Sequence, residues 1–179
     1  SYGKTNEAKR SRATLMYNEH FGLRELPFTI TPDTSFFFAH ASHQDALNVL
    51  LVALRTGEGF IKVVGEVGTG KTLLCRTLLN ALGPREFETA FIPNPYLEPH
   101  TLLLAVADEL GVGYQGNPNQ HQLLKILTKA LVDAYAQNKR VVLCLDEAQA
   151  MPTETLEALR LLSNLETERR KLLQVVLFG

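Results

Sequence analysis

Residues 60–82 constrain the fold of this chain more than any other segment, because an apolar run, a glycine-rich stretch and an amphipathic run follow one another there without interruption. The apolar run, FIKVV at residues 60–64, has the composition of a buried strand. Beyond the glycines, leucines recur at every fourth residue from Leu74, and Gly83-Pro84 ends the pattern, as expected for a helix with one buried face. The segment therefore predicts a strand, a loop and a helix in direct succession.

The remainder of the chain continues this alternation. Further apolar runs of strand character lie at residues 89–93, 140–147 and 171–179. Helical patterns occupy residues 42–57, 100–110, 120–137 and 153–170. Strands that are almost continuously apolar and joined by helices form right-handed crossovers, which give a parallel sheet with helices on both faces. The predicted fold class is therefore α/β.

The chain divides into three stretches by composition. Residues 1–15 are polar and basic without a helical period, which predicts a disordered or non-native leader, with Met16 as a candidate native start. Residues 16–58 combine an irregular wrap, rich in aromatic residues and proline, with the first helix. Residues 59–179 form the expected α/β core. We expect one principal domain with an N-terminal appendage.

The glycine-rich loop, GEVGTGKT, fits the pattern G-x-x-x-x-G-K-[ST] at every defined position. A strand before this loop and a helix after it would aim backbone N–H groups and the helix N-terminus at phosphate oxygens. Lys71 is then expected to bridge the β- and γ-phosphates, and the Thr72 hydroxyl to bind Mg²⁺. The alternative is a glycine-rich turn with an exposed lysine. The predicted ATP-binding residues are Gly65, Glu66, Val67, Gly68, Thr69, Gly70, Lys71, Thr72 and Leu73.

Two adjacent carboxylates, Asp146 and Glu147, end the apolar run VVLCL, at the edge where parallel sheets bind ligands. We expect Asp146 to hold Mg²⁺ and Glu147 to orient and polarise the attacking water. The alternative is a helix-capping acid with a surface neighbour. Gln149 could contact or sense the γ-phosphate or be a surface glutamine, and Asn164 is a weaker candidate on the next helix. Lys71 and Glu147 are the predicted catalytic residues.

Composition argues against several classes of protein. The formal net charge of −1 at pH 7 removes the bulk electrostatic argument for coating nucleic acid, although a local basic patch stays open. The apolar runs fall short of the roughly 18 residues that span a bilayer, and no signal peptide is expected. Cys75 and Cys144 form no CxxC pair, which favours reduced, buried thiols. No histidine spacing predicts zinc.

Several motifs together carry a family resemblance: YNEHFGLRELPFTITPD, GEVGTGKTLLCR, DELG, LDEAQ and LRLLSNLET followed by KLLQVVLFG. With these the chain resembles the ExeA, or general secretion pathway protein A, group of AAA+ ATPases, which includes MshM-like proteins. The resemblance covers Met16 to Gly179. The phosphate-loop and carboxylate motifs (Walker A and Walker B) are generic, whereas the opening segment and the SNLET stretch make the resemblance specific.

The resemblance implies a RecA-like P-loop core of the AAA+ type. The strand at residues 171–179, the sensor-1 strand of that fold, would lie between the strands at residues 60–64 and 140–147. A helical lid, a sensor residue and an arginine finger would follow Gly179, so the chain would end before the lid. Arg169 is not expected to be the finger because it precedes the last strand.

The resemblance also implies sites and a role. Residues 16–58 would contribute to the nucleotide site, with Phe28, Ile30 and Thr31 as candidates for the adenine side. The implied function is Mg²⁺-dependent ATP hydrolysis for assembly of a type II secretion or pilus complex, on the cytoplasmic face of the bacterial inner membrane. The intact protein is expected to be a homo-oligomer that acts on protein partners, and this chain alone to be weak or inactive as an ATPase.

Two other functions stay open at this point. One is a DNA-transposition helper ATPase of the TniB or IstB kind, which would bind nucleic acid with a strong dependence on salt. The other is a nucleotide-gated scaffold that binds ATP without useful turnover.

Overall fold

A computed structural model describes residues 36–37 and 43–179 of the chain. The chain separates into two compact units, Ser1–Phe36 and Phe37–Gly179, and the fold below is that of the second. The short strand β1 (Phe36–Phe37) lies at the boundary between the two units. The predictions for residues 1–15 and for Phe28, Ile30 and Thr31 fall outside the described residues.

Strands and helices alternate from residue 43 to the end as the sequence predicts, except that two helices in succession, at residues 99–109 and 120–136, separate the third and fourth strands. The elements are α2 (His43–Thr56), β2 (Phe60–Val64), α3 (Lys71–Ala81), β3 (Phe87–Ile92), α4 (Pro99–Glu109), α5 (Gln120–Ala136), β4 (Arg140–Leu145), the 3₁₀ turn η1 (Ala148–Ala150), α6 (Thr153–Ser163) and β5 (Leu173–Phe178). The long strands β2, β5, β4 and β3 are parallel neighbours in that order.

The last strand, β5, lies between β2 and β4, as the family resemblance implies. Phe178 is opposite Val63 of β2, and Leu177 is opposite Leu145 of β4. Every residue of β5 is buried, because the strand has a neighbour on each side and helices over each face. This register brings the carboxyl ends of three strands to the same edge of the sheet.

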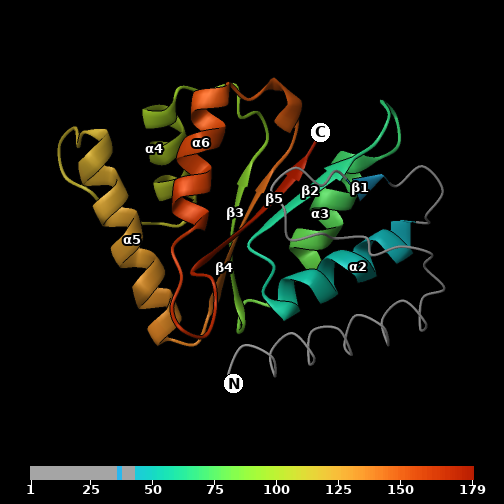
Figure 1. The fold of residues 1–179 in the computed structure, drawn as a ribbon, viewed down its shortest axis with the longest axis horizontal. Helices are drawn as coiled ribbons and strands as arrows, with labels where there is room; N and C mark the ends of the chain where they lie inside the picture. Colours follow the sequence, from blue (N-terminus) through green and yellow to red (C-terminus); the bar gives the residue numbers. More distant parts are fainter. Residues whose placement is uncertain (1–35, 38–42) are drawn as a thin grey trace, which may run out of the picture. The chain divides into compact units, whose positions relative to one another are not determined.

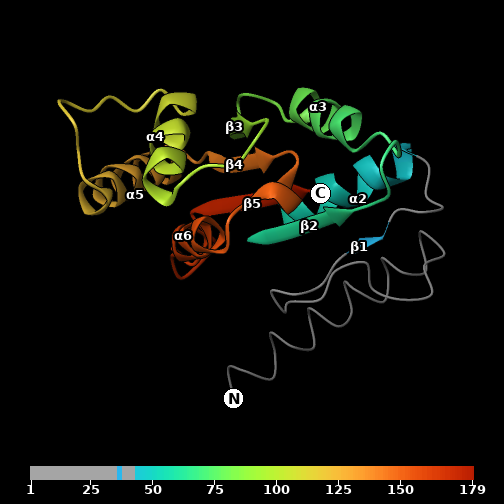
Figure 2. The ribbon, with the colours of Figure 1, turned by 90° about the horizontal axis from the view of Figure 1, so that it is seen from above.

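Helices cover both faces of the sheet (Figure 1). Helices α4, α5 and α6 lie on one face, where leucines from each pack against Leu143 of β4 and Val175 of β5 in one continuous core. Helices α2 and α3 cover the other face, and a view from above shows the same division (Figure 2). In the part of the chain that the structure describes, no helix combines the length and the apolarity that a bilayer crossing needs.

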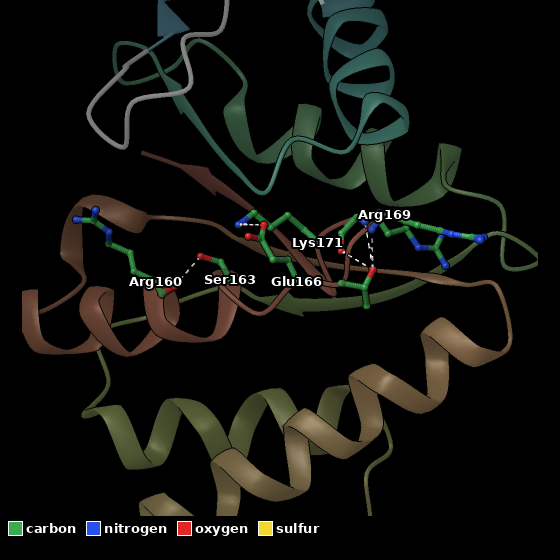
Figure 3. A network of polar contacts seen from close by, with 7 residues as sticks. Arg160, Ser163, Glu166, Arg169 and Lys171 are labelled. Atoms are coloured by element: carbon green, nitrogen blue, oxygen red, sulfur yellow. Dashed lines mark hydrogen bonds and ion pairs between the residues drawn. The ribbon is translucent and has the colours of Figure 1, made fainter. Parts of the chain in front are cut away.

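The helix predicted at residues 153–170 is wrong at its C-terminal end, because α6 ends at Ser163. The next residues form a tight turn closed by an antiparallel bridge between Glu166 and Lys171 (Figure 3). The side-chain oxygen of Thr167 accepts hydrogen bonds from the N–H groups of the two following arginines, at 3.3 and 3.2 Å, which offers the backbone an alternative to a helix. Lys171 Nζ lies 2.7 Å from Glu166 Oε2, and this hydrogen bond lowers the pKa of the glutamate.

Candidate functional site

The strands β2, β5, β4 and β3 end at the same edge of the sheet: Leu145 of β4 pairs with Leu177 of β5, and backbone hydrogen bonds join β5 to β2 and β4 to β3 beyond the paired residues. The N–H of Gly179, after β5, donates to the carbonyl of Val63 at 3.0 Å, and the N–H of Gly65, after β2, donates to the carbonyl of Gly179 at 3.4 Å. The N–H of Asp146, after β4, donates to the carbonyl of Ile92 at 3.0 Å. The glycine-rich loop and the carboxylate pair therefore lie at one edge, with the end of β5 between them.

The loop folds back on itself between β2 and α3. The Thr69 hydroxyl donates to the carbonyl of Glu66 at 2.8 Å. A Cβ added at Gly65 would lie 2.8 Å from the Thr69 side-chain oxygen, so only glycine fits there without a shift of its neighbour. Gly70 immediately precedes α3 with φ 79°, a left-handed conformation that favours glycine. The loop leaves Val67 fully exposed at its tip.

Lys71, the first residue of α3, folds back over the loop. Its ammonium donates to the carbonyls of Gly65 at 2.7 Å and Glu66 at 2.9 Å. No carboxylate among the described residues forms an ion pair with it. Its charge is therefore held in place by neutral groups and stays available to an anion. Thr72 and Leu73 follow in the first turn of α3 with exposed side chains.

Asp146 is buried, with 5% of its surface exposed. One carboxylate oxygen accepts the N–H of Glu147 at 3.0 Å. The second oxygen has no hydrogen-bond donor among the described residues. A buried ionised group with an unpartnered oxygen is costly, so this oxygen is a candidate to face a cation.

Glu147 has a left-handed backbone, with φ 51° and ψ 37°. This conformation is rare for a residue other than glycine, asparagine or aspartate, and such strain concentrates at functional sites. The side chain is exposed, and its Oε2 accepts a hydrogen bond of 2.5 Å from Nε2 of Gln149. The Gln149 amide therefore restricts where the carboxylate can point.

Gln149 also lies against the end of β5. A Cβ added at Gly179 would lie 2.8 Å from Oε1 and 3.0 Å from the backbone nitrogen of Gln149. The close approach of Gly179 was not predicted, because it depends on β5 lying beside β4. Asn164 is the C-cap of α6 and precedes the turn that leads into the start of β5, so it lies near the amino end of that strand and not at this edge.

Two buried thiols lie beneath the site. Cys75 of α3 and Cys144 of β4 are both free, both inaccessible to solvent, and close enough to interact. Hydrogen bonding with Cys75 and burial raise the pKa of the Cys144 thiol well above its ordinary value. The prediction of reduced, buried cysteines is consistent with this arrangement, whereas their contact could not be predicted because the residues lie far apart in the chain.

The family model described as AAA domain matches residues 54–179. The chain belongs to the AAA domain family. General secretion pathway protein A of Aeromonas hydrophila is 44% identical over 164 residues, which are 92% of this chain and 30% of that protein. The chain thus spans less than a third of that relative, and the resemblance to the general secretion pathway protein A group is confirmed.

Two solved structures share the fold of this AAA domain. Cdc6p from Pyrobaculum aerophilum matches with a TM-score of 0.55 at 18% identity, over 90% of this chain and 43% of that one. A chain of the Drosophila ORC structure bound to DNA matches with a TM-score of 0.52 at 23% identity, over 74% of this chain and 36% of that one. The predicted P-loop α/β fold is thereby confirmed.

The oxygens available at this edge of the AAA domain suit a hard cation. Among the described residues, no three His, Cys, Asp or Glu side chains gather as a metal site would require. Mg²⁺ usually takes only one or two protein ligands, together with water and substrate phosphates. The Thr72 hydroxyl and the unpartnered Asp146 oxygen fit this ion better than they fit zinc, which would need more protein ligands.

Proposed function

We propose that this AAA domain binds ATP with Mg²⁺ at the carboxyl edge of its sheet and hydrolyses it. One observation carries the proposal: Gly179 is hydrogen-bonded to Val63 and Gly65, and β5 pairs with β4 up to Leu145, the residue before Asp146, so the phosphate loop and the carboxylate pair end at one edge of the sheet. An uncompensated cation on one side and a buried, partly unpartnered carboxylate on the other are the complementary halves of a site for a metal–phosphate ligand.

The loop from Gly65 to Leu73 would bind the phosphates. Its glycines allow the backbone to approach the ligand closely, and the N–H groups at the start of α3 are not all used within the helix. On binding, Lys71 would exchange its loop carbonyls for phosphate oxygens, which are stronger acceptors. A Lys71 already held beside the loop needs little reordering to do this.

The Thr72 hydroxyl and Asp146 would hold Mg²⁺. When bound, this ion would supply positive charge against the charge that develops on the phosphates during transfer. The unpartnered oxygen of Asp146 would gain a partner in the process, directly or through a bound water. A bound cation would thus account for a carboxylate that directly follows the five buried apolar residues of β4.

Glu147 would act as the base that orients the attacking water and accepts its proton. Its left-handed backbone turns the chain sharply after Asp146, so that two adjacent carboxylates serve different parts of the reaction. Gln149, through its hydrogen bond to Oε2, would hold Glu147 in one orientation until phosphate competes for the amide. Gln149 is thus proposed as a positioning residue rather than as a simple surface glutamine.

The name of the relative, General secretion pathway protein A, supports a role in secretion for the protein that contains this domain. We propose that the protein which contains this domain uses ATP turnover to assemble a secretion or pilus complex at the inner membrane. In this proposal residues 59–179 form the catalytic core, residues 16–58 complete the nucleotide site, and copies of the protein associate with one another. A nucleotide-gated scaffold is the competing outcome, which turnover measurements decide.

Two matched pairs of variants test the proposal. Lys71→Ala should abolish binding of a fluorescent ATP analogue by this chain, whereas Lys125→Ala, an exposed lysine of α5, should leave binding unchanged. Glu147→Gln should keep binding and lose turnover in a steady-state phosphate-release assay on the intact protein. Glu154→Gln, an exposed acid of α6, is its control. Hydrolysis at the unsubstituted rate by Glu147→Gln would remove Glu147 from the role of base.

A further inference from the structure

His43, the first residue of α2, lies against the phosphate loop. A Cβ added at Gly70 would lie 2.6 Å from Cε1 and 2.7 Å from Nε2 of this imidazole. Carbon atoms in favourable contact are about 3.5–4.0 Å apart, so the ring fills the space that a side chain at residue 70 would occupy. Gly70 is therefore required twice, by its left-handed backbone and by the histidine beside it.

The same ring belongs to the wall of the phosphate pocket. His43 lines this pocket together with Gly65, Thr69 and Lys71. Its ring nitrogens have no hydrogen-bond partner among the described residues. The imidazole therefore contacts the loop by van der Waals packing and not by a hydrogen bond. How well it holds the loop depends on the shape of the ring and on how rigidly α2 is fixed.

The opposite end of α2 is fixed to the sheet. The guanidinium of Arg140, at the start of β4, donates to the carbonyls of Leu54 at 2.7 Å and Arg55 at 2.6 Å. The buried amide of Gln174 in β5 donates to the carbonyls of Leu54 at 3.0 Å and Glu58 at 2.8 Å. The carbonyls of Leu54 and Arg55 belong to the last turn of α2, so these bonds tie the C-terminal end of the helix to β4 and β5. The helix therefore holds its first residue at a fixed place beside the loop.

We propose that His43 is a positioning residue of the phosphate loop, which it holds in the nucleotide-binding conformation by packing its ring against Gly70. The proposal rests on the proposed ATP site and adds a residue from outside the loop itself. With the ring in place, the N–H groups that follow Gly70 are arranged before the nucleotide arrives. Without the ring, the loop would become ordered only when the nucleotide binds, and the free-energy cost of this ordering would lower the affinity for nucleotide.

Titration of the nucleotide-free chain with a fluorescent ATP analogue and Mg²⁺ tests this role. His43→Ala should raise Kd about tenfold, as expected when a pre-arranged loop becomes mobile. His43→Phe keeps a planar ring at the same place and should bind within about twofold of the unsubstituted chain. His121→Ala is the matched control, because His121 is also exposed in the first turn of a helix, α5, far along the chain from the loop.

The outcomes separate this inference from the function on which it rests. If the unsubstituted chain binds no ATP, the proposed function fails. If it binds ATP and His43→Ala binds as tightly, only the role of His43 fails. Binding by His43→Phe as weak as that of His43→Ala would also overturn the positioning role, since the ring would then act through a hydrogen bond to the ligand. A lower unfolding temperature of nucleotide-free His43→Ala, relative to the unsubstituted chain, would also overturn the positioning role. His43 would then support the fold in general rather than the loop.

Discussion

Replacement of Asp146 by asparagine should stabilise the nucleotide-free domain and abolish its response to Mg²⁺. The carboxylate is 5% exposed and one of its oxygens has no donor among the described residues. Burial of an ion costs several kcal/mol, of which a charge-assisted hydrogen bond from the Glu147 N–H returns about 1.5–3 kcal/mol. Asparagine keeps a side-chain oxygen that can accept the Glu147 N–H, and it removes the charge. Burial of its NH₂ group without a partner would cost about 1–3 kcal/mol.

The balance predicts a net gain of about 1 kcal/mol for Asp146→Asn, or about 2–4 °C in unfolding temperature for a chain of this size. The measurement is thermal unfolding in EDTA, with ATP and EDTA, and with ATP and Mg²⁺. At a ligand concentration a hundred times Kd, the unsubstituted domain should gain about 2.7 kcal/mol from the nucleotide complex. The variant should gain no more with Mg²⁺ than without it.

Asp133→Asn is the matched control for this prediction. Its exposed carboxylate forms an ion pair with Lys129 at 3.1 Å, and loss of such a pair changes stability by less than about 1 kcal/mol. This control should keep the full response to Mg²⁺. A loss of more than about 1 kcal/mol in nucleotide-free Asp146→Asn would refute the reasoning, because the carboxylate would then be well satisfied without a cation.

Three further predictions concern Gln149, Cys144 and the binding of DNA. Gln149→Ala should keep ATP affinity and lower turnover of the intact protein about tenfold, because Glu147 loses its hydrogen-bond donor; unchanged turnover would leave Gln149 a surface residue. The pKa of the Cys144 thiol is raised in the folded domain, so above about pH 8.5 the unfolded thiol ionises while the folded thiol stays protonated, and the unfolding free energy should fall as the pH rises. In Cys144→Ala this fall should be shallower between about pH 8.5 and 10. A shift assay at low and moderate salt should detect no DNA binding by this chain, given its net charge of −1, and salt-sensitive binding would favour the transposition function.

The sequence predicted the fold where local patterns and burial agree. The run at residues 60–64 is a strand as expected, but its burial alternates: Ile61 and Val63 are buried, whereas Lys62 is exposed, so the strand is not buried throughout as the apolar run predicted. The helix that follows begins at Lys71, within the GEVGTGKT motif, directly after the left-handed residue Gly70. The position of β5 between β2 and β4 came from the family resemblance and not from the run itself, because an apolar strand carries no information about its neighbours.

The misplaced end of α6 has a local cause and a tertiary one. Leu165 continues the apolar spacing of the helix past Ser163, which is why the pattern predicted a longer helix. The chain forms a turn instead because the side-chain oxygen of Thr167 accepts a hydrogen bond from the N–H of Arg170. The guanidinium of Arg170 also donates to the carbonyl of Lys139, beyond the end of α5, at 3.1 Å. The contact with Lys139 spans two elements, so no local pattern could reveal it.

The candidate site was predictable in its types of residue but not in its contacts. The loop pattern and the pair after VVLCL pointed to Lys71, Asp146 and Glu147 from local order alone. The contacts of His43 with Gly70 and of Gln149 with Gly179 join residues from different elements. They depend on strand order and helix packing, which is why only the structure reveals them.

The energetic costs in this domain support the site independently of its sequence motifs. Away from the carboxyl edge, the described elements follow ordinary rules: Asn119 and Gln122 form a capping box at α5, and the left-handed residue Asn138 is of a type that tolerates this conformation. At the edge, Glu147 has a left-handed backbone that costs about 1–2 kcal/mol, and Asp146 buries a carboxylate with an unpartnered oxygen. Both costs fall on adjacent residues at the same edge of the sheet as the phosphate loop. Strain and a buried charge on adjacent residues are expected at a ligand site, and a metal–phosphate ligand would offset the charge of Asp146 directly.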